Sequence, residues 1–471
     1  MRCASLGPLL FALLLAFAWP AATATAVPTI ADASGSNVPG ITAARLTPAF
    51  WISRLRQPDR VLLDAADIAR RNAVLFRIDP SMHDLHALPP QLPQAQVLGW
   101  IEALAKRPQA TLFDATGQAV PASTFDDILD NRDLDAIPAA QPTRYGLVVH
   151  RAALRSFPTD LRVFSKVGDN DIDRFQESAL FPGTPVVIAH RSRDLRWLFV
   201  VAPRYAAWVA QDAIAEGDRQ QVLRYAEQAP YRIVTDATLR TAFTPEAPAV
   251  SQLQLDMGVR LPLSTTASDT INGQNPYTSW TVELPVRGTD GRLAFAPALL
   301  PRQAGTASAP LALTRANVLR QAFRFLGERY GWGHDYGARD CSGFVSEVYR
   351  SMGVVLPRNT GDQARSPALD RVHFDGEGPS RERRAALRRL QVGDLVYLPG
   401  HVMLVIGRIG DAPYVIHDIH GGMLRDADGR LRALHLNAVS VTPLMPLRFD
   451  DGVPFADRIT DIVRIRPTRA P

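Results

Sequence analysis

The chain contains two cysteines, Cys3 and Cys341, and Cys3 falls within a predicted export signal. A structural disulfide needs two cysteines, so the processed chain cannot rely on an internal disulfide. It must fold around a hydrophobic core, and its 46% hydrophobic content is ordinary for a globular protein. Cys341 is then either a small buried residue or a nucleophile that a histidine elsewhere in the chain activates.

The N-terminus has the pattern of a secretory signal. Arg2 precedes an apolar run over 9–19, and small residues follow at 24–26. We therefore assign residues 1–26 to a signal peptide that is cleaved after Ala26. The run is too short to span a bilayer, and no later stretch reaches about 18 apolar residues. We expect an exported protein, periplasmic or extracellular, without an integral membrane segment.

The charge balance excludes few classes of protein. The formal net charge is +5, from 52 Lys and Arg against 47 Asp and Glu. Lys106 and Lys166 are the only lysines, so arginine carries nearly all of the positive charge. Genome composition and adhesion to an anionic cell envelope both explain such an excess. Nothing indicates a nucleic-acid reader.

The periodicity of the apolar residues divides the processed chain into four parts. Residues 27–140 show short helical patterns and form a predicted N-terminal helical region. Alternating strand patterns follow, with a glycine-led strand at 183, a tryptophan-led strand at 197 and a closing strand that contains Trp208. This order resembles bacterial SH3-like domains. We predict one SH3-like barrel over 141–228 and a second over 229–302, which bind or position a ligand or act as spacers.

Cys341 lies at the start of a predicted helix in the last part, 311–467. A glycine-containing loop runs into Asp340, and apolar residues recur at helical spacing from Phe344 to Met352. The backbone N–H groups and the dipole of a helix N-terminus stabilise an anion. We therefore expect a lowered pKa for the Cys341 thiol, as a nucleophile requires.

Among the ten histidines, His401 is the best candidate for the base. It follows a strand over 392–398 and opens the next strand, so its ring would be mounted rigidly. The strand after that ends in His417, which would lie close to His401 and fix its tautomer. His420 is the alternative for this role.

A helix that bears the cysteine, packed on an antiparallel sheet that bears the histidine, is the papain-like arrangement of an α+β fold. The chain has no second cysteine near Cys341 that would complete a structural zinc site. We expect neither a metal nor a cofactor.

A series of short motifs supports this reading. In chain order they are Tyr330-Gly331-Trp332-Gly333, Asp340-Cys341-Ser342-Gly343-Phe344-Val345, Leu356-Pro357-Arg358-Asn359-Thr360 with Gln363, Gly393-Asp394-Leu395-Val396, Gly400-His401-Val402 and Ile416-His417. Together they resemble the NlpC-type (NlpC and p-sixty) cell-wall cysteine peptidases over about 315–465. The helical region and the two barrels resemble multidomain members of that family.

The resemblance implies hydrolysis of peptidoglycan stem peptides between the γ-carboxyl of D-glutamate and a diamino acid such as diaminopimelate. It implies that Cys341 attacks the carbonyl, that His401 is base and then acid, and that His417 orients His401. Tyr330 would join the Cys341 N–H in an oxyanion hole.

The resemblance also assigns residues to substrate binding. Asp340 and Ser342 would hold the free amino terminus of the substrate, although Asp340 is equally suited to cap the helix. Trp332 would contact the substrate. The stretch 365–389 is longer and more basic than this family needs, which fits either a solvated helix of mixed charge or a segment that faces an anionic glycan or lipid surface.

Three other functions fit the same residues. The first is an N-acetylmuramoyl-L-alanine amidase, which would cut a different bond. The second is a catalytically inactive scaffold that binds the wall. The third is transfer of the acyl group to an amine instead of water. The partner in each case is peptidoglycan or soluble muropeptides, and the sequence leaves the choice between them open.

Overall fold

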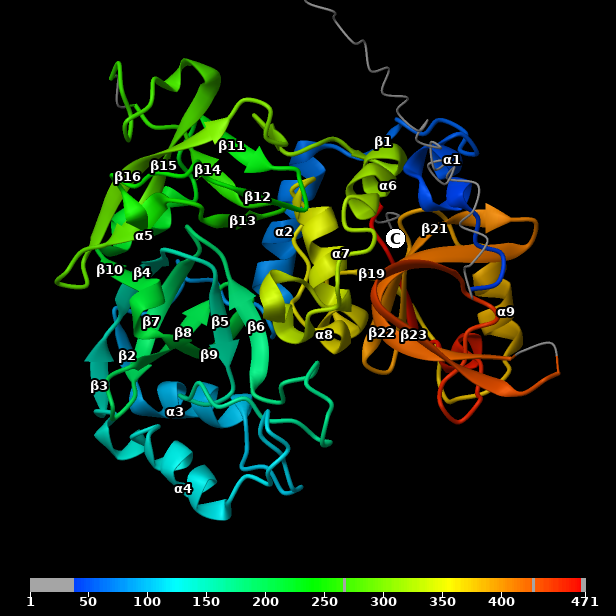
Figure 1. Ribbon diagram of the computed structural model, residues 1–471, viewed down its shortest axis with the longest axis horizontal. Coiled ribbons are helices and arrows are strands. Elements are labelled where there is room, and N and C mark those ends of the chain that lie inside the picture. The colour runs from blue at the N-terminus through cyan, green and yellow to red at the C-terminus, as the bar shows by residue number, and fades with distance from the viewer. Residues whose placement is uncertain (1–37, 266–267, 426–427, 467–471) are drawn as a thin grey trace, which may run out of the picture.

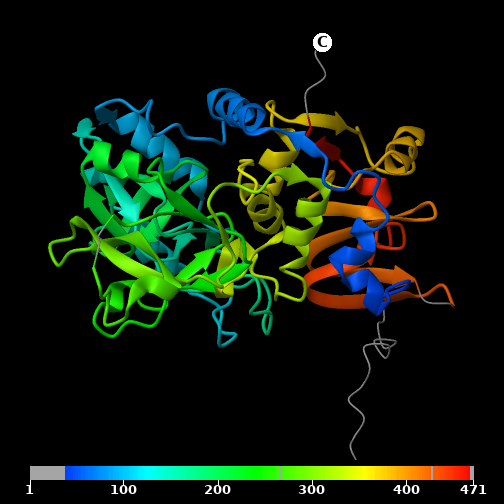
Figure 2. The ribbon, with the colours of Figure 1, turned by 90° about the horizontal axis from the view of Figure 1, so that it is seen from above.

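The computed structural model describes residues 38–265, 268–425 and 428–466. The predicted signal peptide lies outside the described residues. In Figures 1 and 2, two β-rich regions lie on one side of a central group of helices, and the C-terminal sheet lies on the other.

The N-terminal region is rich in helices, as predicted. Its elements are α1 (Pro48–Ile52), β1 (Val61–Leu63), α2 (Ala65–Ile78), β2 (Gln91–Pro93), α3 (Gln94–Leu104), α4 (Ala122–Asp130) and β3 (Ala140–Pro142). Asp64 caps α2, because its side chain accepts the N–H of Asp67 at 2.8 Å.

This region is joined to the C-terminal part of the chain. β1 pairs with β18 (Leu313–Thr314), and Asn72 of α2 both donates to the carbonyl of Gly353 at 2.8 Å and accepts the N–H of Val355 at 3.0 Å. Trp51 is 1% exposed and belongs to the core of the C-terminal part. The N-terminal region therefore helps to complete that core.

The first β-rich region is an antiparallel sheet in the order β10-β4-β7-β8-β9-β5-β6. Its strands are β4 (Arg144–Val148), β5 (Ala152–Arg155), β6 (Gln176–Leu180), β7 (Pro185–Arg191), β8 (Trp197–Ala202), β9 (Tyr205–Ala210) and β10 (Ile214–Gly217), and α5 (Arg219–Tyr225) follows. The predicted strand that follows Gly183, the tryptophan-led strand at 197 and the closing strand that contains Trp208 are confirmed as β7, β8 and β9. Alternate side chains pack on two hydrophobic clusters, one of which contains the fully buried Trp208.

The second β-rich region consists of three small described sheets around one core. They contain β11 (Tyr231–Val234), β12 (Thr238–Arg240), β13 (Gln254–Asp256), β14 (Arg260–Pro262), β15 (Ser279–Arg287), β16 (Leu293–Pro301) and β17 (Thr306–Ala307). Val282, Leu284 and Leu300 are fully buried in that core. The domain limits drawn from the sequence stay predictions.

The C-terminal part has the predicted arrangement of helices on an antiparallel sheet. Its elements are α6 (Arg315–Phe323), α7 (Cys341–Arg350), α8 (Thr360–Arg365), β19 (Asp370–His373), α9 (Arg381–Arg388), β20 (Leu395–Leu398), β21 (His401–Ile409), β22 (Ala412–Arg425), β23 (Leu431–Pro443) and β24 (Asp461–Arg464). The described strands form one sheet in the order β19-β24-β20-β21-β22-β23.

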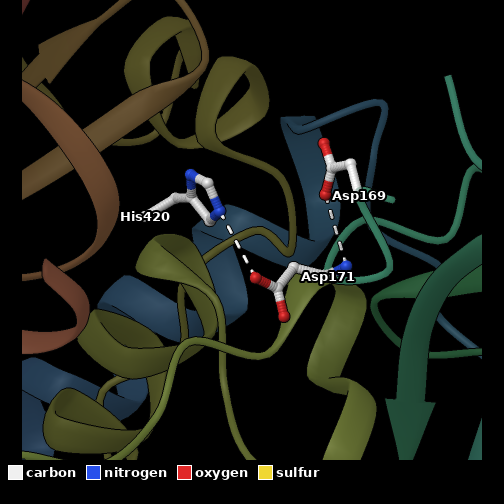
Figure 3. A group of neighbouring side chains, drawn as sticks. All are labelled: Asp169, Asp171 and His420. Carbon is white, nitrogen blue, oxygen red and sulfur yellow. Dashed lines mark hydrogen bonds and ion pairs between the residues drawn. The ribbon is translucent and has the colours of Figure 1, made fainter. Parts of the chain in front are cut away.

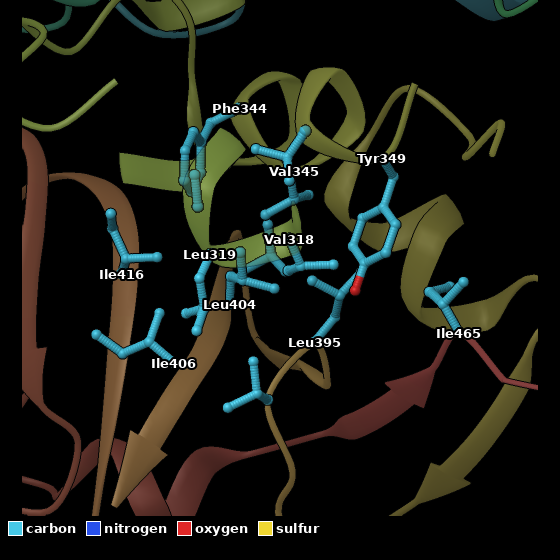
Figure 4. Packing of buried hydrophobic residues seen from close by; sticks show 14 of the residues in the cluster. Val318, Leu319, Phe344, Val345, Tyr349, Leu395, Leu404, Ile406, Ile416 and Ile465 are labelled. Carbon is cyan, nitrogen blue, oxygen red and sulfur yellow. The ribbon is translucent and has the colours of Figure 1, made fainter. Parts of the chain in front are cut away.

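Helices α6 and α7 cover one face of this sheet. Figure 4 shows Leu319 of α6 and Phe344 of α7 against Leu404 and Ile416 of the sheet. A second cluster lines the other face, where Leu387 of α9 is buried. Because apolar side chains fill both faces, the sheet is a rigid support for the residues at the start of β21.

A buried arginine joins the second β-rich region to the C-terminal part. The Arg339 side chain is 0% exposed and donates to Asp256 at 2.5 Å, to Glu328 at 2.8 Å and to Glu347 at 2.9 Å. It also donates to the carbonyl of Ala237 at 2.6 Å. One guanidinium therefore holds three carboxylates from different segments.

Within the described ranges, every helix is too short or too polar to cross a bilayer.

Candidate active site

Cys341 is the first residue of α7, as predicted. Asp340 caps the helix, because its Oδ1 accepts the N–H of Gly343 at 2.7 Å. Cys341 is 4% exposed, and its Sγ lies 3.7 Å from Oγ1 of Thr360 and 3.9 Å from the carbonyl oxygen of Gly400. The thiol thus lies between the start of α8 and the turn before His401.

A tight turn positions His401. β20 and β21 pair so that Leu398 faces His401, and Pro399 and Gly400 make the connection between them. Gly400 has a φ of +75°, which glycine adopts without strain, and proline followed by glycine favours a type II turn. This turn fixes the backbone of His401 at the mouth of the sheet.

His401 and His417 are hydrogen-bonded, as the sequence predicts. Nε2 of His401 lies 2.8 Å from Nδ1 of His417, and Nε2 of His417 lies 2.9 Å from Oγ1 of Thr442. Both contacts are satisfied when each Nε2 carries a proton and donates it onward. That arrangement leaves Nδ1 of His401 unprotonated and able to accept a proton.

His420 makes different contacts. Its side chain is exposed, and its Nε2 lies 3.5 Å from Oδ2 of Asp171 in a loop of the first β-rich region (Figure 3). His417, by contrast, is 0% exposed and bonded to His401. The geometry therefore favours His417 over His420 as the residue that orients His401.

Replacing these two histidines separates their roles. We expect His417→Ala to lower kcat/KM by about 10²- to 10⁴-fold, because His401 would lose the acceptor that fixes its tautomer. His420→Ala serves as the matched control and should change kcat/KM less than about tenfold. The measurement is steady-state hydrolysis of a stem peptide, and a larger loss in the His420 variant would reverse the assignment.

Burial makes the thiol and the imidazole neutral. It raises the pKa of Cys341 to about 12, and Asp340 beside it acts in the same direction. Burial also lowers the pKa of His401 from 6.5 to about 4. The expectation of a lowered thiol pKa was wrong for the free protein, because the cost of burying a thiolate exceeds the effect of the helix dipole. His401 must then remove the thiol proton as the thiol attacks.

The pH dependence of kcat/KM follows from these values. Protonated His401 cannot act as a base. The value of kcat/KM should therefore fall as the pH drops through about 4, and it should be constant between that pH region and neutral pH. A pH–rate profile with a small γ-glutamyl substrate measures this limb. An acid limb centred near 6.5 or above would contradict a neutral thiol and imidazole pair.

Tyr330 lines a cleft beside these residues. The cleft has a volume of about 570 Å³ and is also lined by Gly400, His401 and His420. Burial raises the pKa of Tyr330 well above its usual value, so its hydroxyl stays protonated and can donate a hydrogen bond. A backbone hydrogen bond from Tyr330 to the carbonyl of Asn437, at 3.0 Å, holds it at the edge of the sheet.

Asp340 and Ser342 are both engaged by Arg358. The Arg358 guanidinium donates to Oδ2 of Asp340 at 2.7 Å and to Oγ of Ser342 at 2.9 Å. Burial alone would raise the pKa of Asp340, but the positive charge of Arg358 lowers it to about 2. Asp340 therefore caps α7 as an ionised carboxylate, and a substrate amine would have to share it with Arg358. The sequence had not assigned a role to Arg358.

Trp332 contacts the first β-rich region. Its indole N–H donates to the carbonyl of Gln176 in β6 at 3.0 Å. The next residue, Glu177, accepts a hydrogen bond from Tyr205 at 2.6 Å, and Tyr205 in turn interacts with Arg358 and Asn359. No sequence pattern pointed to Glu177 or Tyr205, because only the packing of the two regions brings them to this side of the site.

Asp169, Asp171 and His420 offer ligand atoms within 4.8 Å of one another (Figure 3). The Asp171 carboxylate already pairs with Arg329 and accepts a hydrogen bond from Asn437 at 3.0 Å. The group thus joins a loop of the first β-rich region to the C-terminal part at one end of the cleft.

Two family models match the chain. The SH3 domain (SH3b1 type) matches residues 162–210, and the NlpC/P60 family matches residues 327–432. A curated relative, the gamma-D-glutamyl-L-lysine dipeptidyl-peptidase of Bacillus cereus, is 30% identical over 193 residues, or 39% of this chain. The match spans about half of that relative's length, 48%.

A solved structure extends the likeness to most of the chain. An NlpC/P60 endopeptidase from Photobacterium damselae subsp. piscicida has a TM-score of 0.71 at 17% identity, covering 88% of this chain and 96% of that one. The two proteins share a fold. Residues 327–432 therefore form a domain of the NlpC/P60 family, and an SH3 domain of the SH3b1 type precedes it.

Proposed function

We propose that this protein is an exported cysteine endopeptidase that hydrolyses peptidoglycan stem peptides between the γ-carboxyl of D-glutamate and a diamino acid such as diaminopimelate. The observation that carries the proposal is the hydrogen-bonded pair His401 and His417, at 2.8 Å, beside a cysteine at the first position of α7. A buried thiol with a base mounted on a rigid sheet is suited to acyl transfer.

In the proposed mechanism, Sγ of Cys341 attacks the γ-carbonyl carbon while Nδ1 of His401 takes the thiol proton. The carbonyl oxygen becomes an oxyanion, which accepts hydrogen bonds from the Tyr330 hydroxyl and the Cys341 N–H. His401 then gives its proton to the departing amine, and a thioester remains on Cys341. His401 next removes a proton from water, and the resulting attack releases the carboxylate and the free thiol.

The choice of bond is supported by the curated relative, whose name specifies a γ-D-glutamyl-L-lysine bond and release of a dipeptide. The ionised Asp340 carboxylate near the nucleophile is an acceptor suited to a substrate ammonium group, which would bind it alongside the Arg358 guanidinium. We therefore propose short stem peptides with a free amino terminus as the better substrates, with Ser342 and Trp332 among the contacts.

Three substrates test this proposal. Mature protein and a Cys341→Ala variant are incubated with L-alanyl-γ-D-glutamyl-diaminopimelate, with its N-acetylated form and with intact sacculi. We expect rapid cleavage of the free tripeptide, slower cleavage of the acetylated one, and none by the variant. Release of whole stem peptides from sacculi would identify an amidase instead. Sedimentation with sacculi without any release would identify a binding scaffold.

We also propose export through cleavage after Ala26 and domain limits of 27–140, 141–228, 229–302 and 311–467. N-terminal sequencing of the secreted or periplasmic protein tests the cleavage site. Limited proteolysis tests the domain limits, because the cuts should cluster at those limits. An uncleaved N-terminus would contradict export by this route.

A further inference from the structure

A second pocket lies far from the cleft, where the N-terminal region meets the peptidase sheet. Its volume is about 370 Å³, and it is lined by Arg54 and Arg56 on one side and by Arg315 and Arg408 on the other. Arg408 is in β21, seven residues after His401. A strand rises about 3.3 Å per residue, so the pocket is on the order of 20 Å from the catalytic pair.

The charge of this pocket is uncompensated. None of the described residues that line it is acidic. Arg315 donates to Oε1 of Gln391 at 2.7 Å, and Arg408 donates to the carbonyls of Asp411, at 2.8 Å, and Leu387. These acceptors are neutral, so they orient the two guanidinium groups without cancelling their charge.

The two arginines of the N-terminal region are still less engaged. The Arg54 guanidinium lies 4.2 Å from the centre of the Phe50 ring, and Arg56 has no hydrogen bond or ion pair to any residue in the described part of the chain. Both side chains are exposed at the rim. They can therefore close over a bound group.

Two features of the pocket are unfavourable unless an anion is bound. Four arginines line one small volume, and their like charges repel one another. Arg315 is also the first residue of α6, where the helix dipole disfavours a positive charge. A bound anion would offset both effects.

The wall of the pocket is fixed before any ligand arrives. Trp51 is 1% exposed, and its indole N–H donates to the carbonyl of Arg45 at 2.8 Å. Gly407 packs so closely that an added Cβ would lie 2.7 Å from the Trp51 ring. Trp51 and Gly407 thus give the pocket one rigid apolar wall, next to which charge-assisted hydrogen bonds are stronger than in open water.

The basic stretch that the sequence singled out extends the same surface. Arg408 binds the carbonyl of Leu387 in α9, and Arg384, Arg388 and Arg389 beside it are exposed. We propose that the pocket between α1 and β21 binds a phosphate group, because several guanidinium forks match the oxygens of phosphate better than the two oxygens of a carboxylate. The phosphate belongs either to an anionic lipid headgroup or to a free phosphate ester.

Calorimetric titration with inorganic pyrophosphate tests the site on the mature full-length protein. The Arg54→Gln/Arg56→Gln variant should bind at least about tenfold more weakly than the unaltered protein. The control is Arg224→Gln/Arg432→Gln, which removes the same charge from exposed arginines outside the pocket and should bind as the unaltered protein does. All three should keep the same peptidase activity, which confirms folding.

Sedimentation with vesicles identifies the source of the phosphate. Vesicles of phosphatidylcholine are compared with vesicles that also contain phosphatidylglycerol. If the protein binds only the vesicles that contain phosphatidylglycerol, and the Arg54→Gln/Arg56→Gln variant does not bind them, the phosphate belongs to a lipid headgroup. If the protein binds pyrophosphate but neither kind of vesicle, the phosphate belongs to a soluble phosphate ester. No binding of either probe, or equal weakening in the control variant, would overturn the proposal.

Discussion

Replacing Cys341 by alanine is expected to lower kcat/KM for a γ-D-glutamyl substrate by about 10⁴-fold or more, because no other group can form the thioester. The fold should tolerate the change, since alanine fits where the buried thiol was and α7 keeps its Asp340 cap. Steady-state assays measure the loss, and thermal unfolding of the same sample confirms that the variant is folded. Activity within tenfold of the unaltered protein would remove Cys341 from the mechanism.

Replacing Arg339 by methionine should have the largest effect on stability. Asp256, Glu328 and Glu347 would lose their shared guanidinium, and two of these carboxylates are almost completely buried. Removing one partner from such a network costs about 3–5 kcal/mol of the free energy of unfolding. Urea unfolding followed by tryptophan fluorescence measures the change.

The matched control for this prediction is Arg329→Met. The Arg329 side chain is 60% exposed and pairs with Asp171 near the surface. Exposed ion pairs contribute about 0–1 kcal/mol, so the control should unfold close to the unaltered protein. Similar unfolding curves for both variants would show that the Arg339 network does not hold the two regions together.

The sequence predicted the parts of the site that depend on local patterns. The glycine loop and the helical spacing placed Cys341 at the start of α7, and the alternation of apolar residues placed His401 and His417 on neighbouring strands. These features depend on residues close together in the chain, and the pairing of β21 with β22 brings the two histidines to the same part of the sheet.

The contacts between distant segments could not be predicted in this way. Arg358, Glu177 and Tyr205 reach the site from segments whose relative position depends on how the regions pack. The core role of Trp51 likewise depends on where the N-terminal region docks. The thiol pKa was mispredicted for the same reason, because the degree of burial outweighs the helix dipole and is a property of the whole fold.

The most direct test of the central claim is mass spectrometry of the products that mature protein forms from L-alanyl-γ-D-glutamyl-diaminopimelate in ¹⁸O-labelled water. We predict free diaminopimelate and L-Ala-D-Glu with one ¹⁸O atom in its γ-carboxylate, and no products with the Cys341→Ala variant. Unlabelled acyl products joined to an added amine would indicate transfer instead of hydrolysis. Release of free L-alanine, or an intact substrate, would contradict the proposed bond.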